Sequence, residues 1–275
     1  MLEIPEASFI ASQIRSSLGG KKIHQVVTAY TPHKLAWFYG DPESFADLLQ
    51  GQSIGGAAGY GGLLEIEAGS TRMLFGDGVN LRFHEKGEAR PKKHQLLVEF
   101  QDGSALSASV QMYGGLGAFI EGSLENPYYL AAREKPSPLT ADFNEDYFTD
   151  LITAPEVQKV SAKAFLATEQ RIPGLGNGVL QDILYKAGIH PKKKIRDLSG
   201  QEQSTLYSSV TGTLIEMTEQ GGRDTEKDLY GRPGGYITRL SKNTVKQPCC
   251  KCGGTIHKES YLGGSIYYCD GCQKL

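Results

Sequence analysis

The stretch that decides the fold is IPGLGNGVLQDILYKAGIHP, residues 172–191. A short turn from Pro173 to Gly178 holds three glycines, and an apolar run at helical spacing follows it as far as Ala187. A glycine-rich turn that opens a helix presents free backbone N–H groups at the positive end of the helix dipole, which suits a phosphate. Asn177 is placed to cap that helix or to donate to a phosphate oxygen. A tight connection between two helices explains the same residues, so the turn alone leaves both interpretations open.

Helical spacing continues on both sides of this turn. We expect helices over Asp146 to about Ile152, Ser161 to Glu169, Gly178 to Ala187, and Gln201 to Glu219, the last ended by Gly221-Gly222. A basic run follows the turn and consists of Lys192, Lys193, Lys194 and Arg196. From residue 186 onward, fourteen Lys and Arg outnumber nine Asp and Glu, although the whole chain has a net charge of −2. This mild basic excess suits phosphate contact, and a solvated surface explains it equally well.

The cysteines indicate a metal site. All five lie in the last 27 residues, as the pairs Cys249-x-x-Cys252 and Cys269-x-x-Cys272 with Cys250 inside the first pair. Each C-x-x-C turn aims two thiolates at one point, and four sulfur ligands are the preferred shell of structural zinc. We therefore expect one structural Zn²⁺ at the base of a β-hairpin. Two disulfides with Cys250 left over are the alternative, which a cytosolic chain disfavours.

The N-terminal half has a different pattern. Pro5 to about Leu18 predicts a helix, because Ile10, Ile14 and Leu18 recur at helical spacing. From there to about residue 120 the chain has short alternating segments separated by glycine-bearing turns, which are typical of an antiparallel β-sandwich or barrel. The predicted fold class is therefore α+β, with a leading helix and a β-sandwich followed by a helical domain and a zinc-binding hairpin.

The domain boundaries follow from the same patterns. We expect a β-domain with its leading helix over 1–133, a linker over 134–141, a helical domain over 142–244 and a zinc finger over 245–275. The polar, glycine-rich segment Arg223–Gly235 predicts a mobile loop. A content of 39% hydrophobic and 22% charged residues suits a soluble globular protein. No long apolar run and no signal-peptide pattern occurs, so we expect no membrane span, a cytoplasmic location and a monomer.

At this point the residues resemble a known family. PGLGNGVLQDILYKAGIHP is similar to the helix–two-turn–helix motif of the formamidopyrimidine-DNA glycosylase and endonuclease VIII family. The terminal CxxC…CxxC resembles that family's zinc finger, PLTADFNEDYF resembles the segment after its interdomain linker, and MLEIPEA resembles its opening. The resemblance implies a two-domain clamp with damaged duplex DNA in the cleft. The expected DNA contacts are Lys163 and Asn177, which fall on family positions, with Gly176 of the turn and Lys192, Lys193 and Lys194.

The chain departs from the family where the chemistry lies. The family's nucleophile is an N-terminal proline, and Leu2 stands in its place here. By this alignment Gly59 replaces a β-strand lysine, and the stretch from Leu262 to Ser265 replaces the arginine of the zinc hairpin. Of the residues that the family wedges into the base stack, a methionine is replaced by Gly76 and an arginine by Gln111, while Tyr113 keeps an aromatic role.

Glu3 and Glu6 remain, and they carry the catalytic hypothesis. Without the proline an imine with the sugar is harder to form, so we expect Glu3 to act as general base toward a water that attacks the sugar. Glu6 then helps to position the base or its leaving group. Both carboxylates also lie near the start of a helix, where the helix dipole explains them without catalysis.

The predicted function is release of a damaged base from DNA by hydrolysis of the N-glycosidic bond, without strand cleavage. The lesion is expected to be flipped out of the duplex. The main alternative is a lesion- or structure-specific DNA-binding protein that has lost catalysis. A further alternative keeps the lyase route and uses the amine of Met1 as the nucleophile.

Overall fold

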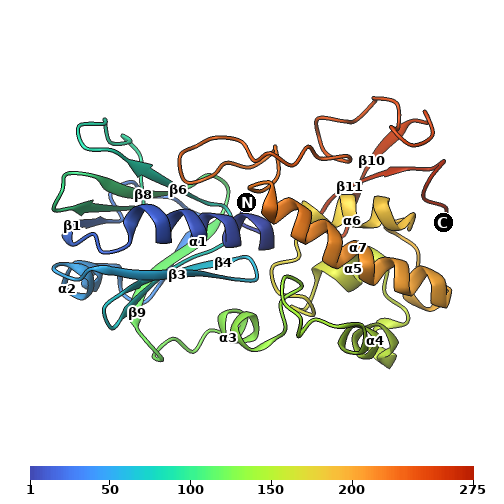
Figure 1. The fold of residues 1–275 in the computed structure, drawn as a ribbon, viewed down its shortest axis with the longest axis horizontal. Coiled ribbons are helices and arrows are strands. Elements are labelled where there is room, and N and C mark those ends of the chain that lie inside the picture. Colours follow the sequence, from blue (N-terminus) through green and yellow to red (C-terminus); the bar gives the residue numbers. More distant parts are fainter.

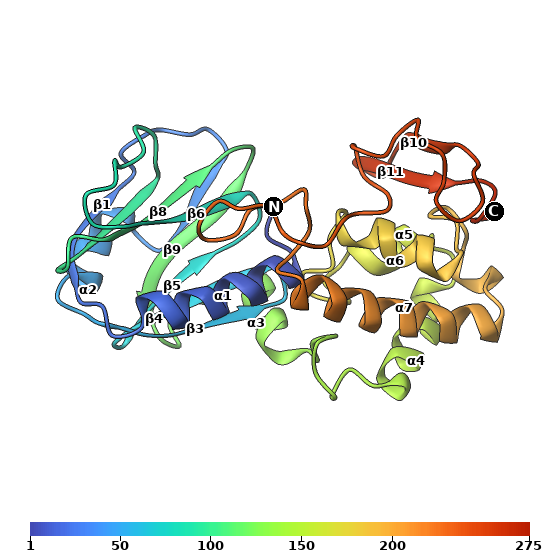
Figure 2. The ribbon, with the colours of Figure 1, turned by 45° about the horizontal axis from the view of Figure 1, so that its top comes forward.

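The computed structural model describes all 275 residues and contains a β-domain and a helical domain side by side (Figure 1). Helix α1 (Ile4–Leu18) lies along the β-domain, and its first turn reaches the junction between the two domains (Figure 2). The remaining elements of the β-domain are β1 (Ile23–Thr28), β2 (Ala36–Tyr39), a short 3-10 turn η1 (Pro42–Ser44), α2 (Phe45–Leu49), β3 (Ile54–Tyr60), β4 (Leu63–Ala68), β5 (Thr71–Phe75), β6 (Val79–His84), β7 (Leu96–Phe100), β8 (Ala105–Val110) and β9 (Gly114–Ile120).

Two sheets share the core of the β-domain. The five-stranded sheet has the order β2-β9-β5-β4-β3, and the four-stranded sheet has the order β1-β7-β8-β6. Every neighbouring pair is antiparallel except β2 and β9, which run parallel. The predicted antiparallel sandwich is therefore confirmed apart from this one pair. Its strands are distant in the sequence, so no hairpin turn fixes their relative direction.

The helical domain contains the four predicted helices. Helix α3 (Pro127–Glu134) precedes this domain and packs on the β-domain through Tyr129. The elements of the helical domain are α4 (Glu145–Thr153), η2 (Pro155–Val157), α5 (Ala162–Ala167), α6 (Val179–Ala187), η3 (Ile195–Asp197) and α7 (Gly200–Glu219), followed by the hairpin strands β10 (Ile256–Tyr261) and β11 (Gly264–Cys269). Helix α5 is shorter than predicted, because Glu169 and Gln170 adopt positive φ angles of 58° and 49° that an α-helix excludes. None of the helices is both long and apolar enough to cross a membrane.

Helix α1 belongs to both hydrophobic cores. Ile10, Ile14 and Leu18 pack among the strands, whereas Ile4 packs in the core of the helical domain. The apolar residues whose spacing predicted this helix are therefore the ones that pack against the β-domain. Its first turn lies against α7, and the two domains share one element at their junction (Figure 2).

The segment Arg223–Gly235 is packed against the protein, which differs from the mobile loop that its composition predicted. Arg223 is 2% exposed, and Leu229 is fully buried in the core of the β-domain. The carbonyl of Leu229 accepts a hydrogen bond from the amide of Phe83 in β6 at 2.9 Å. The segment therefore leaves the helical domain, contacts the β-domain and returns, which adds a second connection between the domains.

Candidate active site and nucleic-acid interface

The first residues of the chain cross the junction between the domains. The amide of Leu2 donates to the carbonyl of Asp77 in the β-domain at 2.7 Å. The amide of Ile4 donates to the carbonyl of Gly174 in the helical domain at 3.1 Å. Glu3 is therefore held between two backbone anchors, one in each domain.

Glu3 caps helix α6. Its Oε1 accepts from the amide of Gly178 at 2.9 Å, and its Oε2 accepts from the amide of Val179 at 2.8 Å. A Cβ atom at Gly176 would lie 2.7 Å from the Glu3 carboxyl carbon, and one at Gly178 would collide with Arg223. In this structure the amides at the end of the glycine-rich turn bind the side chain of Glu3, which lies at the positive end of the α6 dipole. The phosphate contact of this turn stays a prediction.

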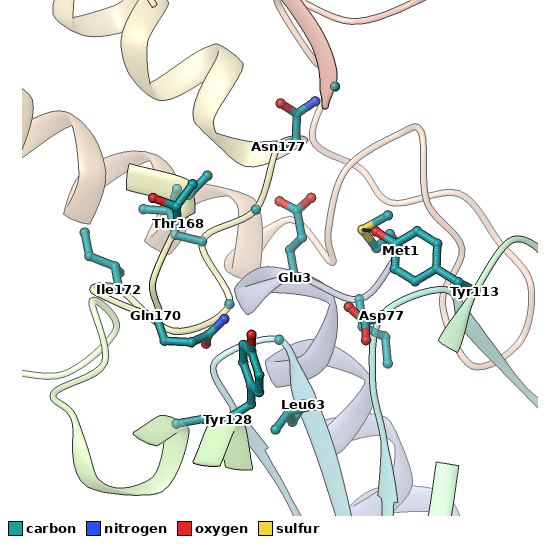
Figure 3. Close-up of a pocket in the computed structure, with 18 of the residues that line it drawn as sticks. Met1, Glu3, Leu63, Asp77, Tyr113, Tyr128, Thr168, Gln170, Ile172 and Asn177 are labelled. Carbon is teal, nitrogen blue, oxygen red and sulfur yellow. Dashed lines mark hydrogen bonds between the residues drawn. The ribbon is translucent and has the colours of Figure 1, made fainter. Parts of the chain in front are cut away.

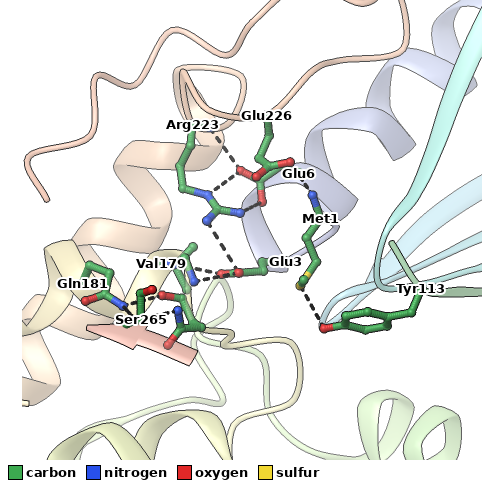
Figure 4. Close-up of polar contacts among 11 residues, drawn as sticks. Met1, Glu3, Glu6, Tyr113, Val179, Gln181, Arg223, Glu226 and Ser265 are labelled. Carbon is green, nitrogen blue, oxygen red and sulfur yellow. Dashed lines mark hydrogen bonds and ion pairs between the residues drawn. The ribbon is translucent and has the colours of Figure 1, made fainter. Parts of the chain in front are cut away.

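Arg223 lies between the two glutamates (Figure 4). Its guanidinium binds Glu6 through Nε at 3.0 Å and Nη2 at 2.8 Å, and its backbone amide donates to the same carboxylate at 3.1 Å. Nη1 lies 3.5 Å from Glu3 Oε1. All three side chains are almost fully buried. Glu3 and Glu6 thus share one guanidinium. The N-terminus of α6 adds positive potential at the Glu3 carboxylate.

The two glutamates differ in their acid strength. Burial raises the pKa of the Glu3 carboxyl above its usual range, and the charge of Arg223 opposes this only in part. Burial acts in the same direction on Glu6, but the charge and hydrogen bonds of Arg223 outweigh it and lower the pKa of Glu6. Glu3 is therefore the stronger base of the two carboxylates, and Glu6 is the weaker one.

A pocket of about 650 Å³ opens beside Glu3, between the two domains (Figure 3). Residues from both domains line it, among them Glu3, Asp77, Tyr113, Tyr128, Lys163 and Asn177. Glu6 and Arg223 do not line it. Glu3 therefore lies at the pocket, whereas Glu6 contacts Arg223 away from its lining. The role of Glu6 in positioning a damaged base stays a prediction.

The amine of Met1 forms an ion pair with Glu226, a residue of the packed segment after α7. The side chain of Leu2 is 7% exposed and belongs to the core of the β-domain. The chain therefore begins with a primary amine held by a carboxylate, next to a residue that has no nucleophilic group.

Lys163 and Asn177 meet the tip of the zinc hairpin. The ammonium of Lys163 donates to the carbonyl of Tyr261, and Nδ2 of Asn177 donates to the carbonyl of Ser265 at 2.9 Å. The Oδ1 atom of Asn177 is buried without a hydrogen-bond partner. Burial lowers the pKa of Lys163. With Gly176, these predicted DNA contacts lie together on the pocket wall.

The predicted basic run does not join them on the pocket wall. Lys192 forms an ion pair with Glu259 of β10, and Lys193 forms one with Glu202, at the start of α7. Lys194 has no carboxylate partner. Their assignment as DNA contacts stays a prediction.

Of two β-domain positions that were compared with the family, Tyr113 lines the pocket and Gly59 does not. A Cβ at Gly59 would lie 2.8 Å from the backbone of Ser8 in α1, so a side chain at this position does not reach the pocket, and Gly62 lines the pocket instead. The alignment of Gly59 with the family's lysine stays a prediction. Tyr113 lines the pocket and stacks on Trp37 with ring centroids 6.3 Å apart.

The four predicted zinc ligands form one cluster at the base of the β10–β11 hairpin. The Sγ atoms of Cys249, Cys252, Cys269 and Cys272 lie within 4.8 Å of one another, and no disulfide links them. Tetrahedral zinc with Zn–S bonds of about 2.3 Å separates its sulfurs by about 3.8 Å, and two of the pairs here are 3.5 and 3.6 Å apart. The donor set therefore fits a structural zinc ion, and the exposed Cys250 lies outside it.

The chain combines a β-sandwich and a helical domain around a pocket that Glu3 lines, with a four-cysteine hairpin on the helical domain. The chain is 28% identical to the formamidopyrimidine-DNA glycosylase of Bacillus licheniformis and 26% identical to that of Lactococcus lactis subsp. cremoris, over the full length of both chains in each case. No family model matches the chain. The chain is therefore similar to formamidopyrimidine-DNA glycosylases from end to end.

Solved structures support the same fold. The Lactococcus lactis enzyme in complex with DNA that contains an abasic site matches with a TM-score of 0.83, 23% identity, and coverage of 99% of this chain and 100% of that one. The MutM protein of Thermus thermophilus matches with a TM-score of 0.81, 22% identity and 98% coverage of both chains. Another structure of the Lactococcus enzyme holds DNA with a FAPY-dG lesion.

Two site residues were not predicted from the sequence. Arg223 had been assigned to a mobile loop, and its contacts with Glu3 and Glu6 span more than 200 positions. Asp77 lies in the LFGDG turn, where only the neighbouring Gly76 had been considered. Both residues are charged and lie next to glycines in the sequence, and this is the signal that could have identified them.

Proposed function

We propose that the protein binds damaged duplex DNA in the pocket between its domains and releases the damaged base by hydrolysing its N-glycosidic bond. The observation that carries this proposal is the Glu3 carboxylate, which lines the pocket while α6 and Arg223 fix its orientation. Relatives crystallised with abasic or FAPY-dG DNA support the choice of ligand. Lys163 and Asn177 supply polar groups on the same wall.

In this reaction Glu3 acts as general base toward a water molecule. The water oxygen forms a bond to C1′ of the sugar, and its proton goes to Glu3. The bond between C1′ and the base breaks, and the base leaves with the bonding electron pair and takes a proton from solvent. The raised pKa of Glu3 favours this step, because a stronger base accepts the proton more readily. Glu6 takes no part except to hold Arg223.

Met1 and Leu2 favour hydrolysis over a route through an imine. Leu2 has no nucleophilic group, and the amine of Met1 is paired with Glu226. An amine that remains protonated in an ion pair does not attack a sugar carbon. We therefore expect base release to leave the DNA strand intact.

The test is a base-release assay on duplexes that carry oxidised purines or pyrimidines, combined with borohydride trapping on abasic DNA. We expect free base from at least one lesion, no covalent adduct, and a loss of about 10² to 10⁴-fold for Glu3→Gln. Glu219→Gln, an exposed position at the end of α7, is the matched control and should retain full activity. A trapped adduct would instead support the Met1 amine as nucleophile.

A second candidate function is lesion binding without catalysis. The burial of Leu2 at the nucleophile position favours it, because the pocket is retained while the reactive group is lost. Gel-shift titration of abasic and intact duplexes distinguishes the two functions. Tight, lesion-specific binding without base release from any substrate supports lesion binding without catalysis. Equal, weak binding to the abasic and the intact duplex contradicts it.

A further inference from the structure

Asp77 occupies an unusual turn at the edge of the pocket. It lies between β5 and β6, flanked by Gly76 and Gly78, and its φ angle of 56° is in the left-handed region. Aspartate and asparagine tolerate this region better than most residues. Its carbonyl binds the amide of Leu2 at 2.7 Å, so Asp77 is adjacent to the segment that carries Glu3.

The carboxylate of Asp77 forms no hydrogen bond and no ion pair, although it lines the pocket beside Met1 and Tyr113 (Figure 3). The other carboxylates around the N-terminal segment all have partners: Glu3 and Glu6 bind Arg223, and Glu226 binds the Met1 amine. Burial raises the pKa of Asp77, and the Met1 ammonium opposes this only in part.

The left-handed backbone accounts for an aspartate or asparagine at this position, but not for a carboxylate without a partner. Asp102, in the turn between β7 and β8, shows what a structural aspartate does: its carboxylate accepts from the amide of Ser104 at 2.9 Å and pairs with Lys21. Asp77 makes no such contact. A free carboxylate in a pocket for DNA also repels phosphates, so it weakens binding unless it faces a positive charge.

Such a charge arises during loss of a base. As the glycosidic bond breaks, the electron pair leaves with the base and the sugar ring acquires oxocarbenium character, as it does in glycoside hydrolysis. The geometry points to Asp77 as a catalytic residue whose carboxylate faces the flipped sugar and stabilises this positive charge. This inference rests on the proposed function and adds a second carboxylate to it, with Glu3 as the base and Asp77 as the electrostatic partner.

The test compares two abasic-site analogues in the same duplex: a pyrrolidine, which is cationic at neutral pH, and a neutral tetrahydrofuran. We expect the protein to bind the pyrrolidine duplex at least about tenfold more tightly than the tetrahydrofuran duplex. Asp77→Asn keeps the size of the side chain and its tolerance of the left-handed backbone, and it should remove this preference while leaving the tetrahydrofuran affinity unchanged or improved.

The matched control is Asp102→Asn, the same change in another turn of the β-domain, which should retain the preference. The proposal is overturned if the wild-type protein binds both analogues equally, or if Asp77→Asn retains the preference. Base release is measured separately on the same proteins. Its absence would refute hydrolysis, whereas the binding comparison would still decide whether Asp77 faces a positive charge at the sugar.

Discussion

Oε2 of Glu3 accepts a hydrogen bond from the backbone amide of Val179 at 2.8 Å, across 176 positions of the chain. A side chain at the start of the protein therefore supplies the cap of helix α6, whose own N-cap residue, Gly178, has no side chain to offer. The same carboxylate faces the pocket. Substitution of Glu3 thus affects both the junction between the domains and any proton transfer in the pocket.

Arg223→Met should destabilise the protein strongly, because it leaves Glu6 buried and charged without its partner. Removal of one member of a buried ion pair costs about 3–5 kcal/mol. The free energy of unfolding in urea measures this. Arg196→Met is the matched control, since the Arg196 side chain is 59% exposed and should contribute less than about 0.5 kcal/mol. Equal effects at both positions would contradict the assigned role of Arg223.

Glu3 and Glu6 should contribute to stability with opposite dependence on pH. The pKa of Glu3 is raised in the folded state, so its contribution falls as pH rises above the unfolded value of 4.5. The pKa of Glu6 is lowered, so its contribution is complete above 4.5 and is lost only below it. Above pH 4.5, the unfolding free energy of wild type relative to Glu3→Gln should therefore decrease with rising pH. Relative to Glu6→Gln it should stay constant, and a slope of the same sign for both would contradict the assignment.

One zinc ion per chain is expected from elemental analysis of the purified protein. Cys252→Ser should reduce the zinc content and lower the thermal midpoint, because the hairpin relies on the metal for its folding energy. Cys250→Ser is the matched control, since this exposed thiol lies outside the cluster and its loss should leave the zinc content at one. Loss of zinc from the Cys250 variant would show that the ligand set is wrongly assigned.

Affinity for duplex DNA should fall steeply with salt, because the expected contacts are to phosphates. Lys194→Ala should reduce the slope of log affinity against log salt by about one unit. Lys193→Ala should reduce it less, because Glu202 already holds that ammonium in the free protein. Fluorescence anisotropy over a series of salt concentrations measures both slopes, and a flat response of the wild-type protein would exclude the clamp.

The local features of the fold could be predicted from the sequence. Helices α6 and α7 follow from apolar spacing and glycine stops, and the metal cluster follows from two C-x-x-C turns. Helix α3 was not predicted, because it is short and has only two buried residues, Tyr129 and Ala132, to mark a periodic face. The parallel pairing of β2 and β9 has no local signal at all.

The candidate site was predicted where the sequence resembles a known family. Glu3, Lys163 and Asn177 were named at positions of that resemblance, and they lie together on the pocket wall. Arg223 was not found, because its role depends on a packing contact with the opposite end of the chain. The sequence also could not show that Lys192 and Lys193 are paired with glutamates, since those partners are set by the fold.

The contacts of Glu3 form late in synthesis. Residue 3 leaves the ribosome well before its partners Val179 and Arg223. At about 5–20 residues per second, the N-terminal segment waits roughly 10–40 s for these partners. The β-domain is synthesised in that interval, before the guanidinium that neutralises Glu3 and Glu6 exists. The junction beside the pocket is therefore assembled only after Arg223 has been synthesised, and a nascent chain that ends before Arg223 has no finished site.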